Sequence, residues 1–168
     1  MEDQEEIIKV RTKDGEIVEL TKKAAMLVEP LKSMIENFKD YSQLDLNDVN
    51  GKTLTKIKEY LEHYKSEEPK EIQKPFKSAD FKECVNEWDY EFIGKEENID
   101  TLRELILAAN FMNVKGLINL LSAKIAHKIK GINTSTIRNT FGIKELNKDE
   151  EKNFDVDKKY LEDNFDKI

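Results

Sequence analysis

Residues 102–143 place the tightest constraint on the fold, because apolar side chains recur there at the spacing typical of buried α-helices. One apolar run ends at Met112, and a second begins at Leu117 after a Lys-Gly hinge. Gly131 then fits a left-handed helix stop, and Asn133 fits the N-cap of a third, shorter helix. The pattern therefore predicts two packed helices followed by a short helix with one apolar face.

The short third helix has more apolar surface than the chain around it can cover. Ile129, Ile137, Phe141 and Ile143 form this surface, and few residues follow that could bury them. An apolar helical face that the chain cannot cover is typical of a surface on which a partner docks. The stretch predicts a partner-binding adaptor rather than an enzyme.

The first 65 residues predict a small sheet with helices. Apolar residues alternate with polar ones before and after Asp14 and Gly15, a pair that favours the tight turn of a β-hairpin. We expect two short helices after the hairpin, a strand at residues 43–46, and a helix that Asn50 caps and that ends near Lys65. The second half is predicted to be almost entirely helical, with Asp100 as the N-cap of the helix that begins at Leu102.

Composition excludes several classes of function. The 168-residue chain carries a net charge of -7, and its lysines and arginines form no cluster of the kind that duplex binding requires. No apolar run approaches the about 20 residues of a membrane-spanning helix. The single cysteine, Cys84, cannot form an intrachain disulfide, and the acidic N-terminus has no signal-peptide character. We expect a protein of the cytoplasm and nucleus that binds neither nucleic acid nor membranes.

No residue pattern indicates catalysis or a cofactor. His63 and His127 lie far apart in the sequence, and neither has a second ligand three or four residues away, so no metal site is predicted. Cys84 lies beside Glu83 rather than beside a cation, which argues against a catalytic thiolate. No phosphate-binding loop or nucleophile elbow appears. Trp88 is interpreted as a structural anchor.

Two segments are predicted to lie outside the packed elements. Residues 66–80 hold two of the three prolines and many charges, which indicates an exposed, mobile connection. Asn147 with Glu150 three residues later resembles a capping box, and a narrow apolar stripe follows it in a highly charged final helix.

Seven short motifs occur in order between about residues 7 and 152, and together they resemble one family. They are D-G-E-I-V at 14–18, L-N-D-V-N at 46–50, W-D-Y-E-F-I at 88–93, E-L-I-L-A-A-N-F at 104–111, N-V-K-G-L-I at 113–118, I-K-G at 129–131 and T-I-R-N-T-F-G-I at 136–143. The chain resembles the Skp family of S-phase kinase-associated adaptors, which bridge F-box proteins to a cullin in SCF ubiquitin ligases. Elongin C, which shares the core fold, is similar only up to the I-A-H-K-I segment.

The resemblance implies a mostly helical α+β chain. A BTB/POZ domain with a small N-terminal sheet would occupy residues 1–130, and helices that bind F-box proteins would occupy residues 131–168. It also implies a non-catalytic subunit with no cofactor, no metal and no small-molecule substrate. F-box proteins and a cullin would be its partners in ubiquitin-dependent protein degradation.

The resemblance also implies which residues contact each partner. Asn110 and Phe111 would contact the cullin, with Phe111 at a position where the family commonly has Tyr. Tyr160 would stand where the family usually has a Trp that packs on the F-box. The F-box surface would comprise Leu102, Ile106, Ile125, Ile129, Ile137, Phe141, Ile143, Phe154 and Tyr160.

A second class of function stays open at this point. The same apolar face could serve self-association, in a BTB scaffold that forms a homodimer or takes part in a kinetochore-type assembly. A weak homodimer is also compatible with the adaptor. Recovery of an F-box protein or a cullin with the purified chain distinguishes the two classes.

Overall fold

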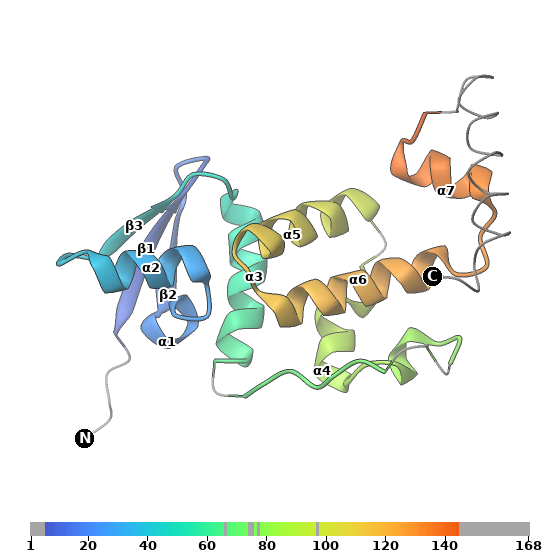
Figure 1. Ribbon diagram of the computed structural model, residues 1–168, viewed down its shortest axis with the longest axis horizontal. Helices are drawn as coiled ribbons and strands as arrows, with labels where there is room; N and C mark the ends of the chain where they lie inside the picture. Colours follow the sequence, from blue (N-terminus) through green and yellow to red (C-terminus); the bar gives the residue numbers. More distant parts are fainter. Residues whose placement is uncertain (1–5, 66, 74–75, 77, 97, 145–168) are drawn as a thin grey trace, which may run out of the picture. The chain divides into compact units, whose positions relative to one another are not determined.

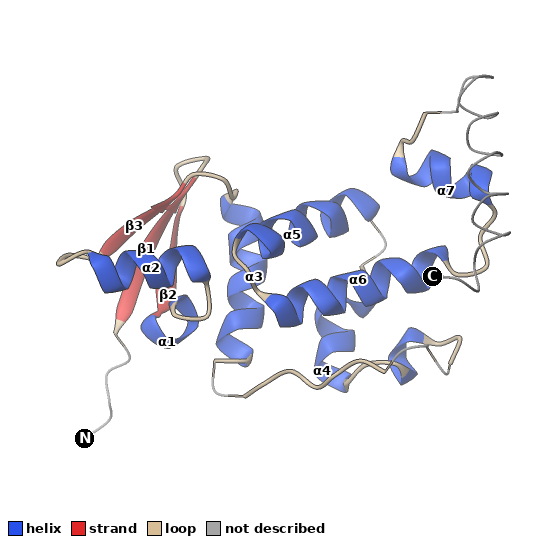
Figure 2. Cartoon of the chain, viewed as in Figure 1, coloured by secondary structure: helices blue, strands red, loops and turns tan. Residues whose placement is uncertain are grey.

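A computed structural model of the chain describes residues 6–65, 67–73, 76, 78–96 and 98–144 (Figure 1). The chain divides into two compact units, of which the first ends at Lys130 and the second begins at Gly131. A small sheet at the N-terminus is followed by helices, as Figure 2 shows, which confirms the predicted α+β class. Each unit is described separately below.

A three-stranded sheet opens the first unit. Strands β1 (Ile7–Thr12) and β2 (Ile17–Thr21) pair antiparallel, and β3 (Gln43–Leu46) pairs parallel with β1, in the order β2-β1-β3. Alternate residues of β1 are buried, so one face of the strand belongs to the core. The predicted hairpin turn is confirmed, since Gly15 adopts a φ of 82° that favours glycine.

Two helices connect β2 to the parallel strand β3. Helix α1 (Lys22–Ala25) is capped by Thr21, whose hydroxyl accepts a hydrogen bond from the N–H of Ala24. Helix α2 (Glu29–Asn37) has Pro30 in its first turn, where the missing N–H costs no hydrogen bond. Leu31 and Ile35 of α2 are buried against the core.

Helix α3 (Gly51–His63) begins at Asn50, as predicted, but the cap is supplied from elsewhere. The Asn50 side chain makes no capping hydrogen bond. The carboxylate of Asp14, in the hairpin turn, accepts hydrogen bonds from the N–H of Gly51 at 2.9 and 3.2 Å. The hydrogen bond from the Thr12 hydroxyl is the largest cause that lowers the pKa of Asp14, and the hydrogen bond from the Gly51 N–H is the second. The hairpin thus supplies the negative charge at the start of α3.

The other elements described in the first unit are helical. They comprise the short turns η1 (Phe81–Glu83), α4 (Glu87–Asp89) and η2 (Tyr90–Gly94) and the long helices α5 (Ile99–Phe111) and α6 (Lys115–Ile129). The predicted cap of α5 at Asp100 is wrong, because Asn98 accepts hydrogen bonds from the N–H groups of Asp100 and Thr101. Asp100 lies inside the first turn of α5, past the capping position.

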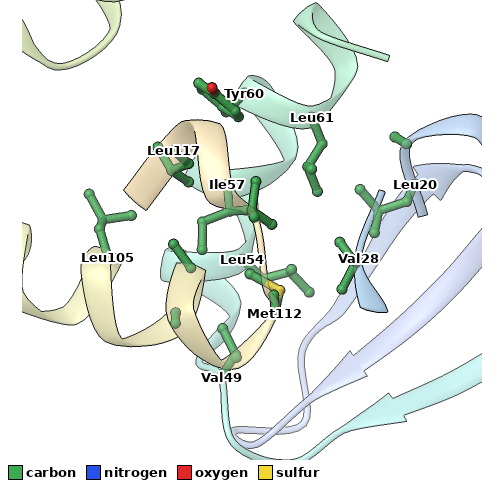
Figure 3. Close-up of a cluster of buried hydrophobic side chains, with 14 of the residues drawn as sticks. Leu20, Val28, Val49, Leu54, Ile57, Tyr60, Leu61, Leu105, Met112 and Leu117 are labelled. Atoms are coloured by element: carbon green, nitrogen blue, oxygen red, sulfur yellow. The ribbon is translucent and has the colours of Figure 1, made fainter. Parts of the chain in front are cut away.

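Helix α3 forms the middle of the core. In Figure 3, Leu54 and Ile57 of α3 lie among Leu20 of β2, Leu105 of α5 and side chains from the start of α6. These side chains are almost fully buried. Burial of each such side chain stabilises the fold by about 1.5–3 kcal/mol. The core therefore fixes α5 and α6, which carry most of the candidate binding residues, to the sheet through α3.

The described part of the predicted connection at residues 66–80 contains no helix or strand. It differs from a fully exposed linker at Ile72 and Phe76, which are half-buried and pack against the core. The Ala79 carbonyl oxygen lies 2.8 Å from Nε2 of His127 on α6. The composition of the segment gave no sign of these contacts, because they depend on α6, about fifty residues later in the chain.

The second unit contains helix α7 (Thr134–Phe141) among its described residues. The Asn133 side chain accepts a hydrogen bond from the N–H of Thr136 at 2.8 Å, which confirms the predicted cap. Gly131, before the helix, has a φ of 77°, as predicted for a left-handed stop, and Gly142 ends α7 with a φ of 63°. Local sequence alone is sufficient to define this helix.

Candidate protein-binding surfaces

The last two turns of α6 carry the first candidate surface. Ile125 and Ile129 lie four residues apart, one turn of helix, and both side chains are half-buried. Ile118 lies seven residues before Ile125 on the same side of α6, and it is also half-buried. Ile118 was not among the predicted site residues, although its spacing from Ile125 could have revealed it. We call Ile118, Ile125 and Ile129 the isoleucine face of α6.

Helix α7 carries the second group of candidates. None of its eight residues is buried. Ile137 and Phe141 are half-buried and one turn apart, while Ile143, just past the helix, is 55% exposed. The N–H of Ile143 donates to the carbonyl of Arg138 at 2.9 Å and closes the end of the helix. The apolar side of α7 is therefore available to a partner.

The outer side of α5 carries the candidate cullin residues. Asn110 is exposed, and Phe111 is 42% exposed at the last position of the helix. Leu107, one turn before Phe111, is 63% exposed, and the sequence analysis did not single it out. Two large apolar side chains one turn apart thus form a small exposed apolar patch on the surface of α5.

Two other predicted F-box residues lie on α5, one in its first turn and one near its middle. Ile106 is half-buried and packs against the core. Leu102 is fully buried, so a partner could contact it only if neighbouring side chains moved. The periodicity of α5 could not distinguish a core position from an interface position, because both are apolar. Contact between either residue and an F-box stays a prediction.

The remaining predicted site residues, Phe154 and Tyr160, lie outside the described residues. The predicted capping box at Asn147 and Glu150 also lies outside them. The described F-box candidates are therefore those of α5, α6 and α7 and the adjoining Ile143.

Stacked side chains join α4 and η2 to α3. The rings of His63 and Trp88 stack with centroids 3.7 Å apart, and Trp88 stacks in turn on Phe92 at 5.0 Å. Nζ of Lys56 lies 4.3 Å from the centroid of the Phe92 ring. Because His63 and Phe92 cover both faces of the indole, the packing supports the interpretation of Trp88 as a structural anchor.

A buried polar cluster lies beside this stack. The hydroxyl of Tyr64 donates to Oδ1 of Asp89 at 2.9 Å, and Nδ2 of Asn86 donates to Oδ2 of Asp89 at 2.7 Å. Desolvation raises the pKa of Asp89, and it raises the pKa of Tyr64 to about 12. The side chains of this cluster form hydrogen bonds with one another, which is typical of a structural network.

Among the described residues, no group of three or more His, Cys, Asp or Glu side chains could hold a metal ion. In the same part of the chain, no helix is long and apolar enough to cross a membrane.

Comparison with known proteins gives consistent matches along the chain. The model of the Skp1 family tetramerisation domain matches residues 6–66, and that of the Skp1 family dimerisation domain matches residues 115–156. The S-phase kinase-associated protein 1 homolog of Tetrahymena thermophila is 36% identical over 81% of this chain and 81% of its own length. SKP1-like protein 12 of Arabidopsis thaliana is 32% identical over 82% of this chain and 84% of its own. The E3 ubiquitin ligase complex SCF subunit sconC of Arthroderma benhamiae is 30% identical over 81% of this chain and 82% of its own length.

Proposed function

Because the chain belongs to the Skp1 family, we propose that it is the adaptor subunit of an SCF ubiquitin ligase. In this role it holds an F-box substrate receptor through α6 and α7 and a cullin through the end of α5. It brings the two partners together and carries out no chemical step itself.

The observation that carries the proposal is that α6 in the first unit, and separately α7 in the second, each carry apolar side chains that are incompletely covered. Ile125, Ile129, Ile137 and Phe141 are half-buried, and Ile143 is exposed. Full burial of such a side chain contributes about 1.5–3 kcal/mol. Because these five side chains are only partly buried, a partner that covered them would gain part of that free energy at each one. An F-box contributes helices, which suit the apolar helical surfaces offered here. Several such contacts together can exceed the several kcal/mol that ordering costs on association.

The cullin surface is separated from Ile129 by most of the length of α6. Phe111 ends α5 just before α6 begins, whereas Ile129 ends α6. A helix of 15 residues is about 22 Å long at 1.5 Å per residue. Partners at the two ends can bind together, as a bridging adaptor requires.

Self-association is the second candidate function. The Skp1 family model that matches residues 115–156 is described as a dimerisation domain, and that range contains α6 and α7. A homodimer built on these helices would cover the same apolar residues as an F-box. The two functions therefore compete for one surface, and an F-box partner should dissociate the homodimer.

The test is capture of partners by the tagged full-length chain, with mass spectrometry of what co-purifies. The adaptor predicts recovery of both F-box proteins and a cullin. A matched sample of the Ile129→Asp variant should lose the F-box proteins and keep the cullin. Recovery of neither partner, together with a purified homodimer that resists dilution, would instead establish the self-associating scaffold.

The proposed adaptor acts in the cytoplasm and nucleus. Fluorescence microscopy of a tagged copy tests this location. Signal confined to another compartment would contradict it.

A further inference from the structure

Two described residues of the chain before η1, Pro69 and Ala79, lie against α6, one at its first turn and one at its last turn. At the first turn, a Cβ added to Gly116 would lie 2.5 Å from Cγ of Pro69, so the ring of Pro69 lies directly against Gly116. At the last turn, Nε2 of His127 lies 2.8 Å from the carbonyl oxygen of Ala79. Gly116 and His127 are eleven residues apart, about three helical turns, and therefore lie on the same side of α6.

Lys124 makes a second connection close to the same side of α6. Its side chain is only 3% exposed, and its ammonium group donates a hydrogen bond to the carbonyl oxygen of Gly94. Gly94 is the last residue of η2, and a carbonyl at a helix end has no N–H of its own helix to bind. The ammonium also lies 5.3 Å from the centroid of the Phe81 ring.

A hollow lies between α6 and the segment that includes η1 and η2. Its volume is about 670 Å³, and its lining includes Phe81, Tyr90 and Gly94 as well as Lys124 and His127. Because side chains do not fill this space, dispersion contacts across it are fewer than in a packed core. The contacts of Lys124 and His127 therefore connect α6 to this segment at a place where apolar packing is incomplete.

The isoleucine face lies on the other side of α6. Ile118 is two residues from Gly116, which turns it by about 200° around the helix. Ile125 and Ile129 share that direction because they follow Ile118 by seven and eleven residues. Helix α6 thus makes these contacts along one side, while the isoleucine face on the other side is only half-buried, with Ile118 and Ile125 partly packed against the core.

We propose that Lys124 and His127 are positioning residues for F-box binding, which fasten one side of α6 so that the isoleucine face is held in its binding geometry. The inference rests on the proposed function, since it concerns how the same surface is prepared. A helix already held in place loses less freedom on association than one that must first be ordered. Loosening the two contacts therefore weakens F-box binding without removing a contacting side chain.

The test uses full-length protein with Lys124→Met and His127→Leu, which keep apolar bulk and remove the polar contacts. His127→Gln is the rescue variant, because its side-chain amide can still donate to the Ala79 carbonyl. Lys115→Met, which removes an exposed charge from the first turn of α6, is the matched control. Two quantities are measured: the Kd for a recombinant F-box domain by calorimetry, and amide hydrogen exchange of residues 118–129 in the free protein.

We expect Lys124→Met and His127→Leu each to weaken the F-box complex about fivefold or more, the effect of one net hydrogen bond. Exchange in α6 should accelerate in both variants, and affinity for a recombinant cullin domain should stay within about twofold. His127→Gln should restore exchange and affinity, and Lys115→Met should resemble the wild type. If the Lys124→Met variant does not fold, the comparison of His127→Leu with His127→Gln decides whether the contact positions the isoleucine face.

Faster exchange with unchanged F-box affinity would overturn the positioning role while leaving the adaptor intact. Unchanged exchange in both variants would show that the two contacts do not fasten α6. A wild-type protein that binds no F-box domain would overturn the proposed function and this inference with it. The exchange experiment separates these outcomes, because it needs no partner.

Discussion

The imidazole of His63 lies parallel to the indole of Trp88, with planes 1° apart and centroids 3.7 Å apart. Phe92 covers the opposite face of the indole at 5.0 Å. Two elements far apart in the sequence, α3 and η2, are thereby joined through one side chain. The stability of the helical half of the first unit should depend on that side chain.

We expect Trp88→Ala to lower the free energy of unfolding by about 2–4 kcal/mol, since it leaves a space between two rings. Trp88→Phe should cost less, because a smaller ring can still stack between His63 and Phe92. Urea unfolding followed by circular dichroism measures both values. Ile17→Ala, at an exposed apolar position, is the control, and an equal loss there would contradict the anchoring role.

Loss of the hydroxyl should affect the stability of the fold differently at Tyr60 of α3 and at Tyr64, which follows one turn later at the end of the helix. Among the described residues the buried Tyr60 hydroxyl has no hydrogen-bond partner, so Tyr60→Phe should leave stability unchanged or raise it by up to about 1 kcal/mol. Tyr64→Phe removes the donor to Asp89 and should cost about 1–3 kcal/mol. Equal effects in thermal unfolding would contradict this account of the cluster.

The capping contact of Asp14 predicts a loss of stability in acid. Its pKa is lowered in the folded chain, so the ionised form contributes stability that is complete above the unfolded value of about 4. That contribution is lost as pH falls through the lower folded value. Asp14→Asn should therefore make stability less dependent on pH between about 5 and 2, as measured by urea unfolding at each pH. Asp48→Asn, an exposed carboxylate just before α3, is the control and should keep the wild-type dependence.

The two partner surfaces should be separable by substitution. Ile129→Asp or Phe141→Asp should weaken F-box binding at least about tenfold, because a carboxylate would be buried in an apolar interface. Asn110→Lys combined with Phe111→Lys should weaken cullin binding and spare the F-box. Calorimetry with each recombinant partner, and far-UV circular dichroism of each variant, measure these effects. Loss of both partners in a folded variant would argue for one shared surface.

Local patterns predicted the elements whose signals lie within a few residues. The turn at Asp14 and Gly15, the stop at Gly131 and the cap at Asn133 all follow from residues adjacent in the chain. A helix cap or a tight turn is specified by two to four residues, so neither needs knowledge of the rest of the fold.

Contacts between distant residues were not predictable in this way. The cap of α3 comes from Asp14, 37 residues before Gly51, and the sequence suggested Asn50 instead. Lys124 gives no sign of burial in the sequence, since a lysine on a helix is usually exposed. Its burial depends on where the Gly94 carbonyl lies, and only the folded arrangement fixes that position.

The candidate surfaces were predictable in part. Apolar periodicity located α5 and α6, but it could not decide that Leu102 is buried while Ile125 is half-buried. Leu107 was missed because its surroundings, rather than its residue type, distinguish it, whereas the seven-residue spacing of Ile118 from Ile125 could have revealed Ile118. Whether each candidate contacts a partner is a question for the binding experiments.

The regular spacing along α6 limits how its sequence can vary in length. One residue inserted between His127 and Ile129 would turn everything after it by about 100° and shift it by 1.5 Å. The insertion would rotate Ile129 away from Ile118 and Ile125 while Lys124 stayed in place. Point changes in α6 can be tolerated one at a time, but a single insertion or deletion would put its fastened side and its binding side out of phase.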